Sequence, residues 1–189
     1  MARTLPLLDA AQRRAFDSPP KFTLAQRQLF FSLPEWAAPV LRAMSAAHMR
    51  CGFILQLGYF KASGRFFTVD RFTAVDRVYV QHQHRLGAVD WNRYDTKASF
   101  RHRPLLLHHF GVAPFDQVQP GVLRQVTHFA RQQMNPVAVF RTAADYLRAH
   151  RWEVPTYAAL AGLVTEALAS VKSLVQRLSE LLPNRAATR

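Results

Sequence analysis

The apolar positions of this chain recur every three or four residues almost throughout, and runs of alternating apolar and polar residues are scarce. This spacing predicts helices, because 3.6 residues per turn then place the apolar side chains on one face. We predict helices over 8–16, 24–31, 35–46, 47–61, 69–86, 96–110, 119–133, 136–150 and 156–182, with Pro104 kinking or shortening the sixth. The expected fold class is all-α.

A soft boundary falls near residues 64–68, where Gly64 can end one helix and Thr68 can cap the next. We therefore predict a first helical module over 1–66, a second over 67–182, and a polar tail over 183–189. Each module contains a basic helix and short turns, an arrangement that fits two tandem helix-turn-helix-like bundles.

The last predicted helix is the longest, and its apolar residues follow a three-four repeat for three heptads. The repeat consists of Leu160, Val164, Ala167, Val171, Leu174, Leu178 and Leu181. It fits a long helix packed against the preceding helices. It also fits self-association with a second chain through residues 156–182, and the spacing leaves both interpretations open.

The charge balance indicates an anionic partner for this helical protein. The chain has 25 Lys and Arg residues against 12 Asp and Glu residues, a net charge of +13, and only four of the basic residues are Lys. Because arginine is always charged and its planar fork matches phosphate oxygens and guanine edges, this composition favours double-stranded DNA. Both halves of the chain carry the excess, so both modules are candidates for DNA contact.

Two predicted helices present basic residues away from their apolar stripes. Arg50 and Lys61 are eleven residues apart and return to nearly the same side of one helix. Arg124, His128 and Arg131 follow i, i+4, i+7 spacing on another. The alternative for each set is an ordinary solvated face.

The interval 96–144 holds six basic residues against one acidic residue, Asp116, so we expect internal ion pairs to occupy few of them. Together with basic residues of the first module, residues of this interval make up the predicted DNA contacts: Arg50, Lys61, Arg65, Lys97, Arg101, Arg103, Arg124, His128 and Arg131.

The sequence argues against a catalytic centre, a cofactor site and a metal site. The single Cys51 excludes a multi-cysteine zinc site, and the histidine pairs His82/His84 and His108/His109 lack the i, i+4 spacing of helical metal ligands. A Gly-rich phosphate loop and the known nucleophile motifs are absent from the sequence. No apolar run approaches the ~20 residues of a membrane span. We expect a cytoplasmic protein that is not an enzyme.

Four motifs resemble the amino-terminal region of Tn-three family transposases. The most specific is GFILQLGYFK at 52–61, and FFSLPEW at 30–36, LHHFGVAPF at 107–115 and EVPTY at 153–157 accompany it in the family's order. The resemblance extends from Phe16 to about Leu182. It implies a bacterial protein with a pair of helical modules that read the terminal inverted repeats of a transposon.

In that family, strand cleavage by an acidic triad with magnesium belongs to a later ribonuclease-H-like domain, which nothing in this chain resembles. The resemblance therefore implies end recognition without catalysis. The alternative function is a helical interaction module of a transposition or regulatory complex.

Overall fold

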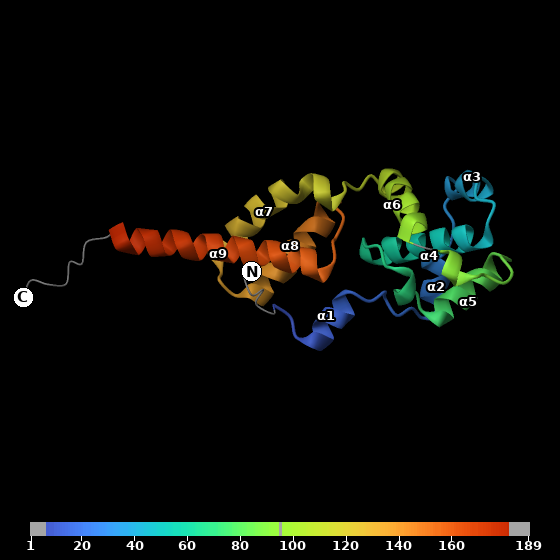
Figure 1. The fold of residues 1–189 in the computed structure, drawn as a ribbon, viewed down its shortest axis with the longest axis horizontal. Helices are drawn as coiled ribbons and strands as arrows, with labels where there is room; N and C mark the ends of the chain where they lie inside the picture. Colours follow the sequence, from blue (N-terminus) through green and yellow to red (C-terminus); the bar gives the residue numbers. More distant parts are fainter. Residues whose placement is uncertain (1–6, 95, 182–189) are drawn as a thin grey trace, which may run out of the picture.

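A computed structural model describes residues 7–94 and 96–181, with the side chains of residues 96–100 outside the description. In these ranges the chain is all-α, as predicted, with nine α-helices and two short 3-10 turns at Val69–Arg71 and Trp91–Arg93. The helices are α1 (Ala10–Phe16), α2 (Leu24–Phe30), α3 (Ala37–Arg42), α4 (Ala47–Ser63), α5 (Ala74–Gln83), α6 (Thr96–Phe110), α7 (Phe115–Gln132), α8 (Pro136–Ala149) and α9 (Tyr157–Leu181). They form two bundles placed end to end, α2–α6 and α7–α9, with α1 beneath the junction (Figure 1).

Local signals account for several helix ends. Asn135 caps α8, because its side-chain oxygen accepts hydrogen bonds from the backbone N–H groups of Val137 and Ala138. Gly64 ends α4 in the left-handed conformation, with a φ of 68°. Thr68 precedes only the first 3-10 turn, and its side chain makes no capping hydrogen bond there, whereas the side chain of Thr73 caps α5.

The first bundle is built around α4, on which α2, α5 and α6 pack. Residues 51–60 of this helix are all buried. Two glycines allow aromatic rings to approach its backbone closely. A Cβ at Gly52 would lie 2.1 Å from Cε2 of Tyr94, and one at Gly58 would lie 2.2 Å from Cδ1 of Phe31. The helix is therefore enclosed on all sides over this stretch.

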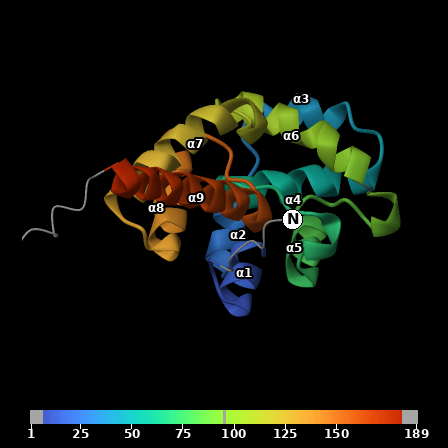
Figure 2. The same ribbon diagram turned by 60° about the vertical axis from the view of Figure 1, so that its left-hand side comes forward.

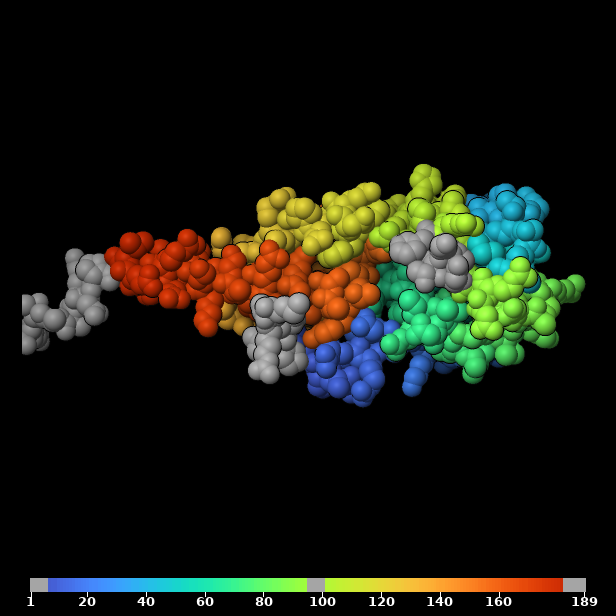
Figure 3. All heavy atoms as spheres, viewed as in Figure 1, coloured from blue at the N-terminus to red at the C-terminus, as the bar shows by residue number. Residues whose placement is uncertain are grey.

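The second bundle consists of α7, α8 and α9, which pack against one another in all three pairs. Its core includes Val126 from α7, Leu147 from α8 and Val164 from α9, each fully buried. The chain preceding α1 joins this bundle, since the backbone N–H of Leu7 donates to the Tyr157 hydroxyl at 3.1 Å. In the space-filling view α1 accordingly lies against the orange carboxy-terminal segment (Figure 3).

The cores do not divide between residues 66 and 67, the predicted boundary of the two modules. Phe67 and Tyr94 share one buried cluster with Phe22 and Phe31. Gly64 ends a helix there, but the following chain folds back on the same core. The division falls instead between α6 and α7, and α1 belongs with the second bundle.

The helix α9 begins as a core helix and ends as a projection (Figure 1). Its apolar stripe is buried as far as Val171, after which Val175, Leu178 and Leu181 are 59%, 52% and 78% exposed. By length and composition α9 is the one described helix that could cross a membrane. The buried residues of α9 all lie between Tyr157 and Val171, so packing in the second bundle accounts for the apolar residues of that part of the helix.

A buried histidine makes the stability of the first bundle dependent on pH. His102 is 1% exposed, its Nδ1 lies 2.9 Å from the Tyr94 hydroxyl, and its buried Nε2 has no hydrogen-bond partner. Burial, together with the positive charge of Arg101, lowers the pKa of His102 to about 4. The folded state therefore resists binding a proton that the unfolded chain accepts near pH 6.5.

We expect the contribution of His102 to the free energy of unfolding to stay constant above pH 6.5 and to fall as the pH drops toward 4. From pH 7.5 to pH 5 the loss from His102 should be about 2 kcal/mol. Urea denaturation at the two pH values measures it, and His102→Gln should reduce the difference by about that amount. An unchanged pH dependence in His102→Gln would contradict this assignment.

Candidate nucleic-acid interface

The exposed side of α7 carries one straight stripe of polar residues and glycine. The stripe consists of Gln117, Gly121, Arg124, His128 and Arg131, at alternating spacings of four and three. Arg124, His128 and Arg131 are all exposed, as the sequence spacing predicts. The opposite side of the helix contributes Val122, Val126 and Ala130 to the core, each with no exposed surface. Burial of that side holds the stripe in a defined orientation toward solvent.

The guanidinium of Arg124 lies beside Gly121, one turn earlier in α7. A Cβ at position 121 would lie 3.8 Å from Nη2 of Arg124 and 4.0 Å from Cη2 of Trp152. The Arg124 side chain therefore folds back toward the amino-terminal end of α7, the usual direction for a long helical side chain. Both distances are ordinary van der Waals contacts, so the position of Arg124 does not depend on a glycine at 121.

The neighbouring helix α6 also has exposed basic residues on the side away from the core of its bundle. Its buried residues, among them Leu106, face α4, whereas Arg101, His108 and His109 are exposed. The helices α3, α6 and α7 form the upper layer in both orientations (Figures 1 and 2). His109 stacks on Trp36 at 4.0 Å between ring centroids, which ties α6 to the region of α3. The predicted contact Lys97 also belongs to α6, but its side chain lies outside the described residues.

Arg103 forms ion pairs with two carboxylates next to this layer. Its Nε donates to Oε1 of Glu153 at 2.7 Å, and its Nη2 donates to Oδ1 of Asp116 at 3.3 Å. The hydrogen bond with Glu153 raises the pKa of Arg103, against the effect of its partial burial. This corrects the prediction of Arg103 as a DNA contact, because its guanidinium joins α6 to the start of α7 and to the chain before α9.

The pairing of Arg103 leaves the outward face of α6 and α7 with uncompensated cations. Among the described residues, Arg101, Arg124 and Arg131 take part in no ion pair. No local signal predicted the pairing of Arg103 with Glu153, which lies fifty residues further along the chain.

The predicted basic flank of α4 is not exposed as a continuous surface. Gln56 is fully buried, and its amide donates to the backbone carbonyl of Phe67 at 2.6 Å. Arg50 is half-buried, and its Nη2 donates to the carbonyl of Ser45 at 3.0 Å. Arg50 therefore does not lie on an exposed helical flank, which its prediction as a phosphate contact required.

Lys61 and Arg65 also serve internal contacts. Lys61 Nζ donates to the carbonyls of Leu29 at 3.0 Å and Ser32 at 3.2 Å, and so neutralises the carboxy-terminal end of α2. Arg65 is 5% exposed, and its Nη2 donates to Oδ1 of Asp17 at 2.8 Å. These contacts correct the two predictions, because both side chains are committed to holding the fold.

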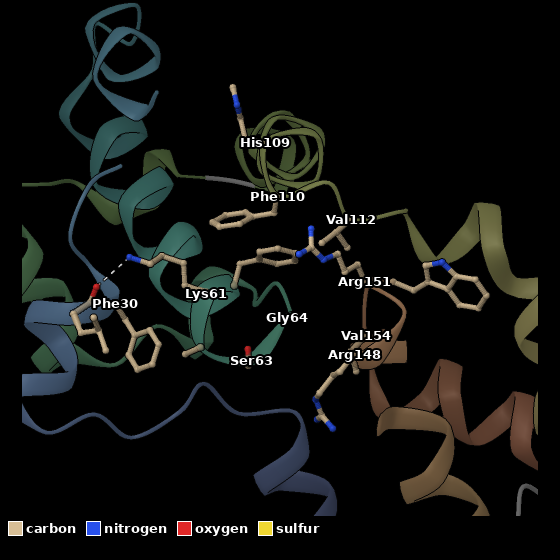
Figure 4. Close-up of a pocket in the computed structure, with 14 residues that line it drawn as sticks. Phe30, Lys61, Ser63, Gly64, His109, Phe110, Val112, Arg148, Arg151 and Val154 are labelled. Atoms are coloured by element: carbon tan, nitrogen blue, oxygen red, sulfur yellow. Dashed lines mark hydrogen bonds between the residues drawn. The ribbon is translucent and has the colours of Figure 1, made fainter. Parts of the chain in front are cut away.

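A groove of about 720 Å³ lies at the junction between the bundles (Figure 4). Phe60 and Phe110 line it together with Lys61, Arg148 and Arg151. The carboxy-terminal ends of α2, α4, α6 and α8 all contribute residues to its wall. Because each of these helix ends carries a partial negative charge, they offset part of the positive charge of the cations in the groove. We therefore place the candidate interface on α6 and α7.

The described residues contain no group of three or more His, Cys, Asp or Glu side chains arranged to hold a metal ion. Residues 7–167 match a family described as a domain of unknown function, DUF4158. No curated protein matches the chain.

Proposed function

The chain belongs to the DUF4158 family, and we propose from the surface of this member that it binds double-stranded DNA through the outward face of α6 and α7. The observation that carries the proposal is the exposed stripe Arg124–His128–Arg131, which has no acidic partner among the described residues. Exposed arginines that lack carboxylate partners keep their hydrogen-bond donors available for phosphates and base edges.

The dimensions of α7 suit the major groove. With its side chains an α-helix is about 10–12 Å across, close to the ~12 Å width of that groove, and the 18 residues of α7 extend about 27 Å along their axis. Arg124 and Arg131 are seven residues apart, which corresponds to about 10 Å along the helix axis. That separation spans about three base-pair steps, so the two guanidinium groups can engage separate phosphates or bases of one groove.

We propose that the DNA is a transposon terminal inverted repeat, on the basis of the resemblance to Tn-three family transposases. Residues 52–61 carry the most specific part of that resemblance, and most of their side chains lie in the core around α4. This motif therefore supports a shared fold more directly than shared base contacts. The proposed role is end recognition, with no catalytic step assigned to this chain.

A salt series tests the proposal. Binding of the full chain to a terminal inverted repeat from its own genomic neighbourhood is compared with binding to a scrambled duplex of equal length. We expect a preference of about 10³-fold or more that persists at physiological salt. Equal binding that falls steeply with salt would leave only nonspecific attraction to a basic surface. Absence of duplex binding at low salt would overturn the proposal.

The projecting end of α9 favours a second candidate, self-association through residues 156–182. The exposed Val175, Leu178 and Leu181 continue the stripe that is buried earlier in the helix. The exposed stretch after Val171 is only about 15 Å long, however, and a stable interface generally buries over ~1,000 Å². This candidate therefore needs additional contacts, and a monomeric mass in solution would set it aside.

A further inference from the structure

A second basic region lies on the opposite side of the molecule from α6 and α7. It is a hollow of about 560 Å³ between the α1–α2 connection, the end of α4 and the last turn of α8. In both ribbon views α1 is below the body of the molecule, whereas α6 and α7 lie along the top (Figures 1 and 2). A straight duplex on the upper face would not reach this hollow.

Four cationic side chains line the hollow, and no carboxylate does. The cations are Arg14, Lys21, Arg65 and Arg148, which come from three separate segments of the chain. Arg14, Lys21 and Arg148 are exposed, so their charged groups can move toward a ligand. Arg148 also pairs with Asp145 at 2.8 Å, but both groups are solvent-exposed and such pairs are weak.

Arg65 supplies the buried part of the hollow. Its guanidinium lies 4.1 Å from the ring centre of Phe16 and 5.4 Å from that of Phe67. Its Nη2 donates to Asp17, while its buried Nε has no hydrogen-bond partner. Asp17 also accepts a hydrogen bond from the backbone N–H of Tyr157 at 2.9 Å. Asp17 therefore accepts hydrogen bonds from two donors, and Arg65 forms the floor of the hollow beneath the three exposed cations.

Charge at helix ends explains part of this cluster. The carboxy-terminal ends of α1, α4 and α8 each contribute about half a negative charge. With Asp17 and Asp145 they leave only a small positive excess, so the argument for an anion site rests on hydrogen bonding. Lys61 shows how a cation satisfies a helix end, because it donates directly to two carbonyls. The four cations of the hollow make no such bond among the hydrogen bonds of the described residues.

We propose that this hollow is an oxyanion site that binds a phosphate group through Arg14, Lys21 and Arg148, with Arg65 at its base. The guanidinium of Arg65 packs against the rings of Phe16 and Phe67, so these rings are not available to stack on a base. The hollow therefore provides positive charge and hydrogen-bond donors for a ligand. The phosphate can belong to a nucleic-acid backbone or to a free polyphosphate, since the same donors recognise both. The site is separate from the interface proposed on α6 and α7.

Calorimetric titration of the full chain with inorganic pyrophosphate tests the site. Arg14→Gln combined with Lys21→Gln removes two exposed donors and leaves the Arg65–Asp17 contact intact. We expect pyrophosphate binding to weaken about 10-fold or more, as for the loss of charge-assisted hydrogen bonds. The matched control, Lys172→Gln with Arg177→Gln on α9, removes the same charge and should bind pyrophosphate like the unmodified protein.

Two outcomes would overturn the proposal: absence of pyrophosphate binding in the unmodified protein, or equal weakening in both double variants. Competition identifies the source of the phosphate. Displacement of pyrophosphate by a short oligonucleotide, in the unmodified protein and in Arg124→Ala/Arg131→Ala alike, assigns the site to a nucleic-acid backbone. Retention of pyrophosphate assigns it to a free phosphate compound. Because the readout is pyrophosphate binding, failure of duplex binding by α7 leaves this test unaffected.

Discussion

Replacing Arg124 and Arg131 together with alanine is expected to weaken duplex binding by about 10²-fold or more. An arginine contact to a base contributes about 1–3 kcal/mol, and these two residues are exposed on one side of α7. Fluorescence anisotropy with a labelled terminal inverted repeat measures the change. The core-facing side of α7 is untouched by the substitutions, so the variant should unfold at the same denaturant concentration as the unmodified protein.

The Arg124→Ala/Arg131→Ala double variant also shows whether these arginines contact phosphates. If both arginines bind phosphates, the dependence of log affinity on log salt should decrease in slope by about two in the double variant. Lys172→Gln with Arg177→Gln provides the control, since it lowers the net charge equally from a distant part of α9. An equal loss of affinity in the control would show that the overall positive field, and not the stripe on α7, is responsible.

Arg124 alone distinguishes base reading from phosphate binding. If its guanidinium contacts a guanine, Arg124→Ala should relax the preference at that base and leave other positions unchanged. A uniform loss across all sequences would make it a phosphate contact. Binding to a set of duplexes with single-base changes separates the two outcomes.

Replacing Asp76 with alanine is expected to lower the free energy of unfolding by about 3–5 kcal/mol, the largest stability effect that we predict. Asp76 is 1% exposed and accepts hydrogen bonds from Arg27 Nε at 2.6 Å and the Tyr59 hydroxyl at 2.9 Å. Burial, together with the Asp76 carboxylate, raises the pKa of Tyr59, so this hydroxyl stays a donor. The substitution would leave the largely buried charge of Arg27 without its partner.

Urea denaturation of Asp76→Ala measures the loss, and Asp70→Ala supplies the matched control. Asp70 also pairs with an arginine, Arg71 at 3.4 Å, but its side chain is 68% exposed. Removing that pair should cost less than about 1 kcal/mol, because solvent screens it. Similar losses in the two variants would show that burial of the Asp76 network does not contribute to stability as argued.

Local sequence determined most of the secondary structure. The helical period, Asn135 as a cap and Gly64 as a stop act within about one turn, so they could be read without knowing the fold. The stripe Arg124–His128–Arg131 is equally local, because its members lie on one helix at i, i+4, i+7 and the opposite apolar residues orient it.

Only the tertiary structure decided which other cations are available. Lys61, Arg65 and Arg103 look alike in sequence, yet each bonds to a group 29 to 50 residues away in the chain. The enclosure of α4 and the division of the cores between α6 and α7 also depend on packing between distant segments. Periodicity describes which residues share a face of one helix, whereas burial and ion pairing depend on which faces meet. For this protein the sequence was therefore sufficient to locate most of the helices and the α7 stripe, and the packing of the two bundles decided which of the other predicted cations stay exposed.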